Sequence, residues 1–142
     1  VRCMTYLSQK GVGVLTPKQE IAEQADIPGH FLAKIAQDLA KAGLITIQQG
    51  AKGGYVLQRK PASITLLEVV EIMIGEITLN DCVAKPGVCS VSTSCATHQV
   101  WKKARKQLRE TLGAVSFADL SHDGESCIPV PVFPVHSLPP GS

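Results

Sequence analysis

Apolar residues recur every three or four positions between residues 28 and 42, which predicts an amphipathic helix with one face in the core. That face is formed by Phe31, Leu32, Ile35, Ala36, Leu39 and Ala42. Gly43 suits the C-terminal cap that ends such a helix. A shorter helix is predicted just before it, over residues 17–26, with Thr16 as its N-cap. Two short helices joined by a tight turn are typical of a helix-turn-helix.

The spacing of apolar residues changes from helical to alternating after Gly43, which indicates strands. Residues 44–49 are predicted as one strand and residues 55–57 as its antiparallel partner, with the glycine-rich turn GAKGG between them. On its own this pattern predicts only a hairpin. Its position directly after a helix-turn-helix favours a wing, whose glycines allow the backbone to approach a phosphate backbone closely.

Two further helices are predicted after the hairpin. Thr65 and Glu68 form a capping box, and the helix that they open is apolar almost throughout, so we expect it to be buried. A second helix, over residues 97–114, is about 25 Å long and carries more apolar surface than one small winged helix can cover, which predicts packing against a second copy. Its apolar stripe consists of Val100, Trp101, Ala104, Leu108, Leu112 and Val115. Its basic residues, interpreted as a solvated face, are Lys102, Lys103, Arg105, Lys106 and Arg109.

Three of the five cysteines lie together with a histidine in one short segment, at Cys82, Cys89, Cys95 and His98. Thiolates are soft ligands for iron–sulfur clusters, zinc and copper(I). The gaps of six and five residues between the cysteines are wider than those of structural zinc sites and suit a larger object, such as a cluster with two irons. The spacing Cys95-x-x-His98 places a thiolate and an imidazole about one helical turn apart. Reduced, buried thiols beside a surface histidine are the simpler alternative.

Charge is divided unevenly between the two halves of the chain. Residues 1–60 carry eight Lys/Arg and four Asp/Glu, hence +4, whereas residues 61–142 carry six and eight, hence −2. A basic N-terminal half suits a polyanionic partner, although a mixed, solvated surface accounts for it equally well. No apolar run approaches the roughly 18 residues that span a membrane, and the N-terminus lacks the pattern of a secretory signal, so we expect a cytoplasmic protein.

Four segments together resemble one family, the IscR-type iron–sulfur cluster regulators, which are bacterial winged-helix transcription factors. The segments are FLAKIAQDLAKAGL (31–44), GAKGGY (50–55), ITLLEVV (64–70) and CATHQVW (95–101). The resemblance extends over roughly residues 2–120. It implies a homodimer with crossed long helices and a [2Fe–2S] cluster, whose ligands would be Cys82, Cys89, Cys95 and, by match to the family pattern, His98.

The resemblance also implies that the partner is double-stranded promoter DNA. The helix that starts at Pro28 would enter the major groove, and the wing would reach the neighbouring backbone or the minor groove. We expect phosphate contacts from basic side chains and base-edge contacts from His30 and Gln37. Gln49 stands where the family often has an arginine, so Lys52 or Arg59 would supply that charge. The residues expected at the DNA are Pro28, His30, Phe31, Lys34, Gln37, Gln49, Lys52, Gly53 and Arg59.

The predicted fold is mainly α with a small β-hairpin, a winged helix-turn-helix followed by a long C-terminal dimerisation helix. We divide the chain into a DNA-binding domain (1–60), a buried connecting helix (61–81), a cluster-binding loop (82–98), a dimerisation helix (99–121) and a Pro-rich tail (122–142). A further short helix is expected over residues 2–9. The tail has no periodicity, and we interpret it as extended or disordered.

The function that these features favour is a transcriptional regulator that senses iron–sulfur, redox or small-molecule status through a [2Fe–2S] cluster. One alternative is a cluster-free regulator of the same fold, which would use a thiol switch, zinc or a protein partner. Another is a small electron-transfer protein in which the helix-turn-helix is incidental. An enzyme is not expected, because the sequence shows no Ser/His/Asp set, paired-carboxylate arrangement or phosphate-binding loop.

Overall fold

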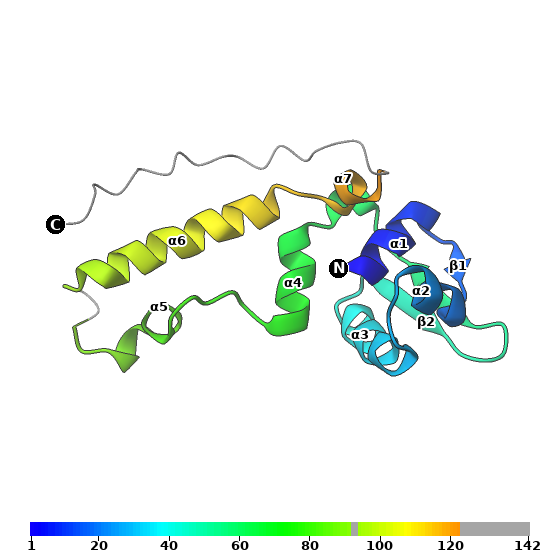
Figure 1. Ribbon diagram of the computed structural model, residues 1–142, viewed down its shortest axis with the longest axis horizontal. Helices are drawn as coiled ribbons and strands as arrows, with labels where there is room; N and C mark the ends of the chain where they lie inside the picture. Colours follow the sequence, from blue (N-terminus) through cyan, green and yellow to red (C-terminus); the bar gives the residue numbers. More distant parts are fainter. Residues whose placement is uncertain (92–93, 123–142) are drawn as a thin grey trace.

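The computed structural model describes residues 1–91 and 94–122, and its elements follow the predicted order (Figure 1). A helical and β-sheet domain lies at one end of the molecule, and a long helix extends away from it. The helices of the first part are α1 (Arg2–Lys10), α2 (Lys18–Gln24) and α3 (Gly29–Lys41). The strands are β1 (Leu15–Thr16), β2 (Ile45–Gln48) and β3 (Gly54–Leu57). The predicted class, mainly α with a small antiparallel sheet in a winged helix-turn-helix, is confirmed.

The sheet has three strands in the order β1-β3-β2, one more than the predicted hairpin. Thr16 pairs with Tyr55 in the added strand β1, so the prediction of Thr16 as the N-cap of the following helix is wrong. The residue before α2 is Pro17, and it makes no side-chain capping bond. The Thr16 backbone is extended in the ladder, and its hydroxyl is buried without a hydrogen-bond partner among the described residues.

Gly54 is required by this third strand. A Cβ at Gly54 would lie 2.2 Å from the carbonyl oxygen of Thr16, a distance that real Cβ atoms do not tolerate against backbone. We therefore expect Gly54→Ala to lower the free energy of unfolding by more than about 2 kcal/mol, because β1 must move away from β3. Urea denaturation followed by circular dichroism measures this.

Gly113→Ala is the matched control. A Cβ at Gly113 would meet only the Leu67 side chain at 3.6 Å, an ordinary contact distance. Alanine in that helical position is expected to be neutral or to stabilise by up to about 1 kcal/mol. Equal stability of the two variants would contradict the close approach of β1 to β3.

The hydrophobic core lies between α1, α3 and β3 and is closed by two elements from later in the chain. These are α4 (Leu66–Ile74) and α7 (Phe117–Ser121). Phe117 of α7 is fully buried, and its backbone N–H donates to the Ile64 carbonyl at 2.9 Å. Figure 1 shows that α6 runs back toward the domain, where α7 packs against α1. The helix α7 is thus attached to the winged helix beside the N-terminal end of α4.

Two burial predictions are wrong in the single chain. Phe31 was expected on the core face of α3, yet it is 56% exposed. The helix α4 was expected to be buried throughout, but only Val69 is fully so and Ile74 is 72% exposed. A helix packed on one side of a small domain can bury only one face, so its remaining apolar residues lie outside the core.

The remaining elements form an arm beside the winged helix. They are the 3₁₀ turn η1 (Pro61–Ser63), the short helix α5 (Asp81–Ala84), the 3₁₀ turn η2 (Pro86–Val88) and the long helix α6 (Ala96–Gly113). The helix α6 corresponds to the prediction for residues 97–114 and has no fully buried residue. Within the described residues, no helix is both long and apolar enough to cross a membrane. The predicted Pro-rich tail and Cys127 lie outside the described residues, apart from His122.

Candidate DNA interface and sensor loop

The exposed face of α3 carries the residues that were expected at DNA. Pro28 immediately precedes the helix, and His30, Phe31, Lys34 and Gln37 are all exposed on it. The rings of His30 and Phe31 lie with their centroids 4.3 Å apart in a tilted arrangement. Because these side chains make a mixed basic, aromatic and amide surface on one helix, they suit both phosphate and base-edge contacts.

A depression of about 270 Å³ joins this face of α3 to the wing. It is lined by Gln37 of α3 and by Gln49 and Gly53 of the wing, so the structure brings three of the predicted residues together. Lys18 and Gln48 line the same depression and were missed from the sequence. Lys18 opens α2 shortly after β1, and the pairing of β1 with β3 places it beside the wing.

The wing is a tight turn that depends on glycine. Gly50 has a positive φ of 109°, and a Cβ at Gly53 would lie 2.2 Å from the Gln48 carbonyl oxygen. Lys52 is exposed at the tip. A backbone held this close to itself, with one lysine at its tip, suits contact with a phosphate backbone.

Arg59, predicted as a phosphate contact, forms polar contacts within the chain. Its guanidinium pairs with Glu68 of α4 at 2.5 Å and donates to the Ser63 carbonyl at 2.7 Å. The residue therefore links the end of the hairpin to α4. The Thr65 side chain accepts a hydrogen bond from the Glu68 backbone N–H, so half of the predicted capping box is present. The Glu68 side chain binds Arg59 and does not complete the other half.

The four predicted cluster ligands lie on α5, η2 and the start of α6. Cys82 is in α5, Cys89 follows η2, and Cys95 and His98 are at the N-terminus of α6. All three thiols are free and half-buried. The Nδ1 atom of His98 lies 3.4 Å from Sγ of Cys82, although the two residues are sixteen positions apart.

The spacing of this pair suits two ligands of one metal. At metal–sulfur and metal–nitrogen lengths of about 2.3 and 2.0 Å, two ligands of a tetrahedral ion lie roughly 3.5 Å apart. Sulfur and imidazole donors fit iron in a cluster, and they fit zinc as well. Among the described residues, no three potential ligands gather in one place, so the structure joins Cys82 to His98 and leaves Cys89 and Cys95 apart from them.

Cys3 is a thiol of another kind. It is buried in the core beneath α1, and burial raises its pKa to about 11. Because the thiolate is the reactive and ligating form, Cys3 is inert at neutral pH. The half-buried cysteines of residues 82–95 are therefore the accessible thiols of the described part of the chain.

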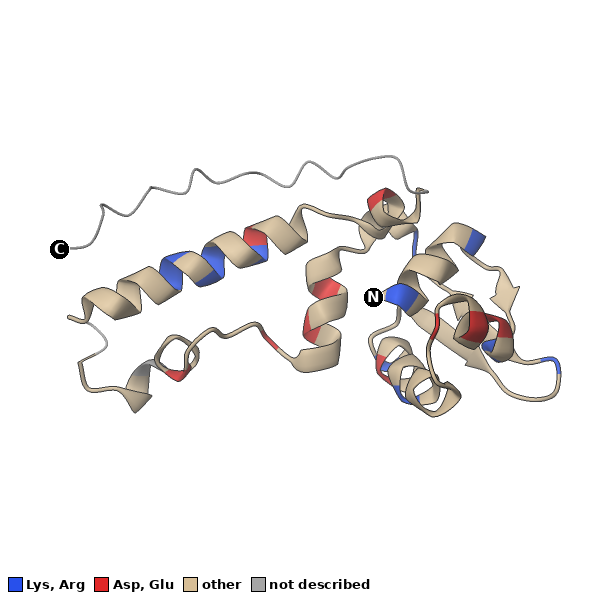
Figure 2. Ribbon diagram, viewed as in Figure 1, with Lys and Arg blue, Asp and Glu red and all other residues tan. Residues whose placement is uncertain are grey.

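Charged contacts attach the arm to α4 and to the segment after it. The interpretation of the basic side of α6 as a solvated face is therefore wrong for Arg105 and Arg109, whereas Lys102, Lys103 and Lys106 are exposed. Arg105 pairs with Glu76 and donates to the Ile77 carbonyl at 2.8 Å, and its side chain is only 21% exposed. Arg109 pairs with Glu71. Figure 2 shows acidic residues on α4 and on the segment that follows it, and basic residues along α6. These contacts join α6 to α4 and to the segment that follows it.

A family model described as Rrf2, an iron-dependent transcriptional regulator, matches residues 1–123. The chain belongs to the Rrf2 family. Among curated relatives, this Rrf2-family chain is 31% identical over 109 residues to protein rrf2 of Nitratidesulfovibrio vulgaris, a match that covers 77% of the chain and 73% of the relative. It is 30% identical over 109 residues to the HTH-type transcriptional regulator IscR of Aliivibrio salmonicida, covering 77% of the chain and 64% of that protein.

Solved structures agree with this assignment. The fold is similar to T. potens IscR with a TM-score of 0.63 and 28% identity, covering 84% of this chain and 77% of that one. It is also similar to CymR, the global cysteine regulator of B. subtilis, with a TM-score of 0.68 and 26% identity, covering 84% and 88%. The protein is thus a DNA-binding transcriptional regulator of the IscR and Rrf2 type, and its relatives are regulators rather than enzymes.

Proposed function

We propose that this Rrf2-family regulator binds promoter DNA as a homodimer and senses iron–sulfur or redox status through a [2Fe–2S] cluster. Its ligands would be Cys82, Cys89, Cys95 and His98. The observation that carries the proposal is the 3.4 Å approach of the His98 imidazole to the Cys82 thiol, two residues that only the tertiary fold joins. The likeness to IscR supports it. When bound, such a cluster supplies a redox-sensitive link among its ligands.

The chain provides a continuous route from these residues to the wing. Cys95 immediately precedes α6, so a shift of the loop moves the start of that helix. The pairs of Arg105 and Arg109 carry the movement to α4. Glu68 of α4 holds Arg59 at the end of the hairpin. A change in residues 82–98 would in this way alter the positions of α3 and the wing, and with them the affinity for DNA.

Anaerobic purification tests the proposal. Protein reconstituted with iron and sulfide is expected to hold about two irons per chain and to show thiolate-to-iron charge-transfer bands. Colourless protein without bound sulfide would contradict the cluster.

The homodimer is supported by the unpartnered apolar face of α6. Val100 is 65% exposed there, and Leu108 lies on the same side two turns further on. Val100→Glu is expected to convert a dimer into monomers, because an unpaired charge in an apolar interface costs several kcal/mol. Sedimentation or light scattering measures the mass. Lys106→Glu is the control and should leave the dimer intact, because its side chain is 76% exposed and lies at least 120° around the helix from Val100 and Leu108.

A cluster-free regulator is the second candidate. It is favoured by the fold similarity to a cysteine regulator and by a thiol–imidazole spacing that fits zinc as well as iron. Metal analysis of the anaerobic protein separates the two candidates: iron with sulfide supports the cluster, whereas zinc alone or metal-free protein with reversible loss of thiols supports the alternative.

A further inference from the structure

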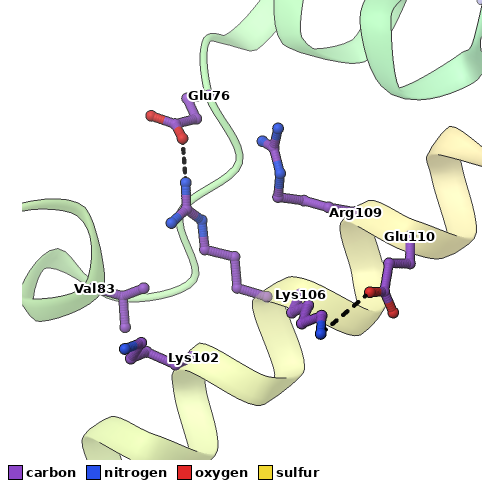
Figure 3. Close-up of a pocket in the computed structure, with 7 residues that line it drawn as sticks. Glu76, Val83, Lys102, Lys106, Arg109 and Glu110 are labelled. Carbon is purple, nitrogen blue, oxygen red and sulfur yellow. Dashed lines mark hydrogen bonds and ion pairs between the residues drawn. The ribbon is translucent and has the colours of Figure 1, made fainter.

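A cavity of about 570 Å³ lies between α6 and the segment that joins α4 to α5 (Figure 3). Its cationic lining residues are Lys102, Arg105, Lys106 and Arg109. The other lining residues include Glu76 and Val83, which approach from the opposite wall. The volume lies within the range of sites for small organic ligands and exceeds what a single inorganic ion needs.

The carboxylates that face these cations are held loosely. Glu76 pairs with Arg105, and Glu110 pairs with Lys106 at 3.6 Å, but their side chains are 66% and 63% exposed. Exposed ion pairs contribute little, so a ligand anion can replace either carboxylate at small cost. Arg109 is the exception, because its partner Glu71 is largely buried.

Lys102 is the cation that no carboxylate offsets. In the part of the chain that the structure describes, it forms no ion pair, and its side chain points into the cavity beside Val83 (Figure 3). The cavity therefore holds one free positive charge and two more that become free when Glu76 and Glu110 turn to solvent. Several cations around one cavity favour a ligand with more than one negative charge.

We propose that this cavity binds a small organic polyanion, with phosphate or carboxylate groups, as an effector of the regulator. Lys102 and Lys106 hold the bound anion. Arg105 also binds it once Glu76 has turned to solvent. It lies next to the sensor loop, because Val83 follows Cys82 directly and His98 precedes Lys102 by one helical turn. Binding there changes the contact between α6 and α4.

The cavity stays open in the proposed dimer. Helical geometry places its cations roughly 150° around α6 from Val100, Ala104 and Leu108, so a partner on the apolar face does not cover them. The site also differs from the DNA interface, since α3 and the wing lie at the other end of the molecule (Figure 1).

Calorimetric titration of the full chain tests the proposal, with fructose bisphosphate and tricarballylate as the two anions and fructose as the neutral control. We expect saturable binding of one or both anions and none of fructose. The stronger of the two identifies phosphate or carboxylate as the preferred group. Lys102→Gln combined with Lys106→Gln is expected to weaken binding about tenfold or more, because charge-assisted hydrogen bonds are lost.

Lys103→Gln is the matched control, since it removes one charge from the same helix outside the cavity. It is expected to change the affinity by less than about twofold. Absence of saturable binding at millimolar anion, or an equal loss in the control and the double variant, overturns the proposal. Neither DNA nor a cluster enters this titration, so its outcome is independent of the proposed cluster sensing.

Discussion

Cys82→Ala is expected to abolish cluster retention. The variant should contain almost no iron and sulfide after anaerobic reconstitution, against about two irons per chain in the parent protein. The reason is geometric: Cys82 is the thiol that lies against His98, so its loss removes a donor from the one place where two predicted ligands already meet. Iron, sulfide and the visible absorption spectrum are the measurements. DNA binding by this variant should no longer respond to oxidation.

Cys3→Ala is the control for the Cys82 variant. It also removes one thiol, but a buried one whose pKa is raised by burial and which lies in the core beneath α1. This variant is expected to lose some stability through the small cavity that it creates and to keep its full iron content. Retention of the cluster by Cys82→Ala, or its loss in Cys3→Ala, would show that the ligands are elsewhere.

Lys34→Ala combined with Lys52→Ala is expected to weaken operator binding by about a hundredfold and to reduce its salt dependence. In a dimer the two changes remove four phosphate contacts, which lowers the slope of log affinity against log salt by roughly four. Both lysines are exposed, one on α3 and one at the wing tip, so the fold should be unaffected. Fluorescence anisotropy with a promoter fragment at several salt concentrations measures both quantities.

Lys85→Ala combined with Lys103→Ala removes the same number of charges and is the control for this pair. Both residues are exposed on the arm rather than on α3 or the wing. Their loss should change the affinity only slightly, through the overall charge of the protein. Equal losses in the two double variants would mean that binding follows net charge and that α3 and the wing are not the contact surface.

The elements that could be predicted from the sequence are those whose signal is local. The helical period of residues 28–42 predicts α3, and the glycines of the wing predict the β2–β3 turn. Both elements depend on neighbours within a few positions along the chain. The long helix α6 was predicted for the same reason. The clustering of Cys82 to His98 likewise marked the candidate sensor loop, because soft ligands close in sequence are unusual.

The tertiary structure decided what depends on distant partners. The sequence predicts Thr16 as a helix cap, yet its pairing with Tyr55 makes it a strand residue. The sequence predicts Arg59 as a phosphate contact, and the fold adds an ion pair with Glu68 that the sequence did not indicate. In both cases the partner belongs to another element: β3 pairs with the Thr16 backbone, and α4 supplies Glu68 to Arg59. Local sequence patterns do not indicate such partners.

The same distinction applies to the candidate sites. The sequence by itself determined which residues have the chemistry to bind DNA or a metal. The fold alone decided that the Cys82 thiol meets the His98 imidazole, that Lys18 joins the wing, and that Arg105 is bound to the α4–α5 segment. Each of these contacts joins groups separated by many residues, so its existence rests on how whole helices pack rather than on any local preference of the chain.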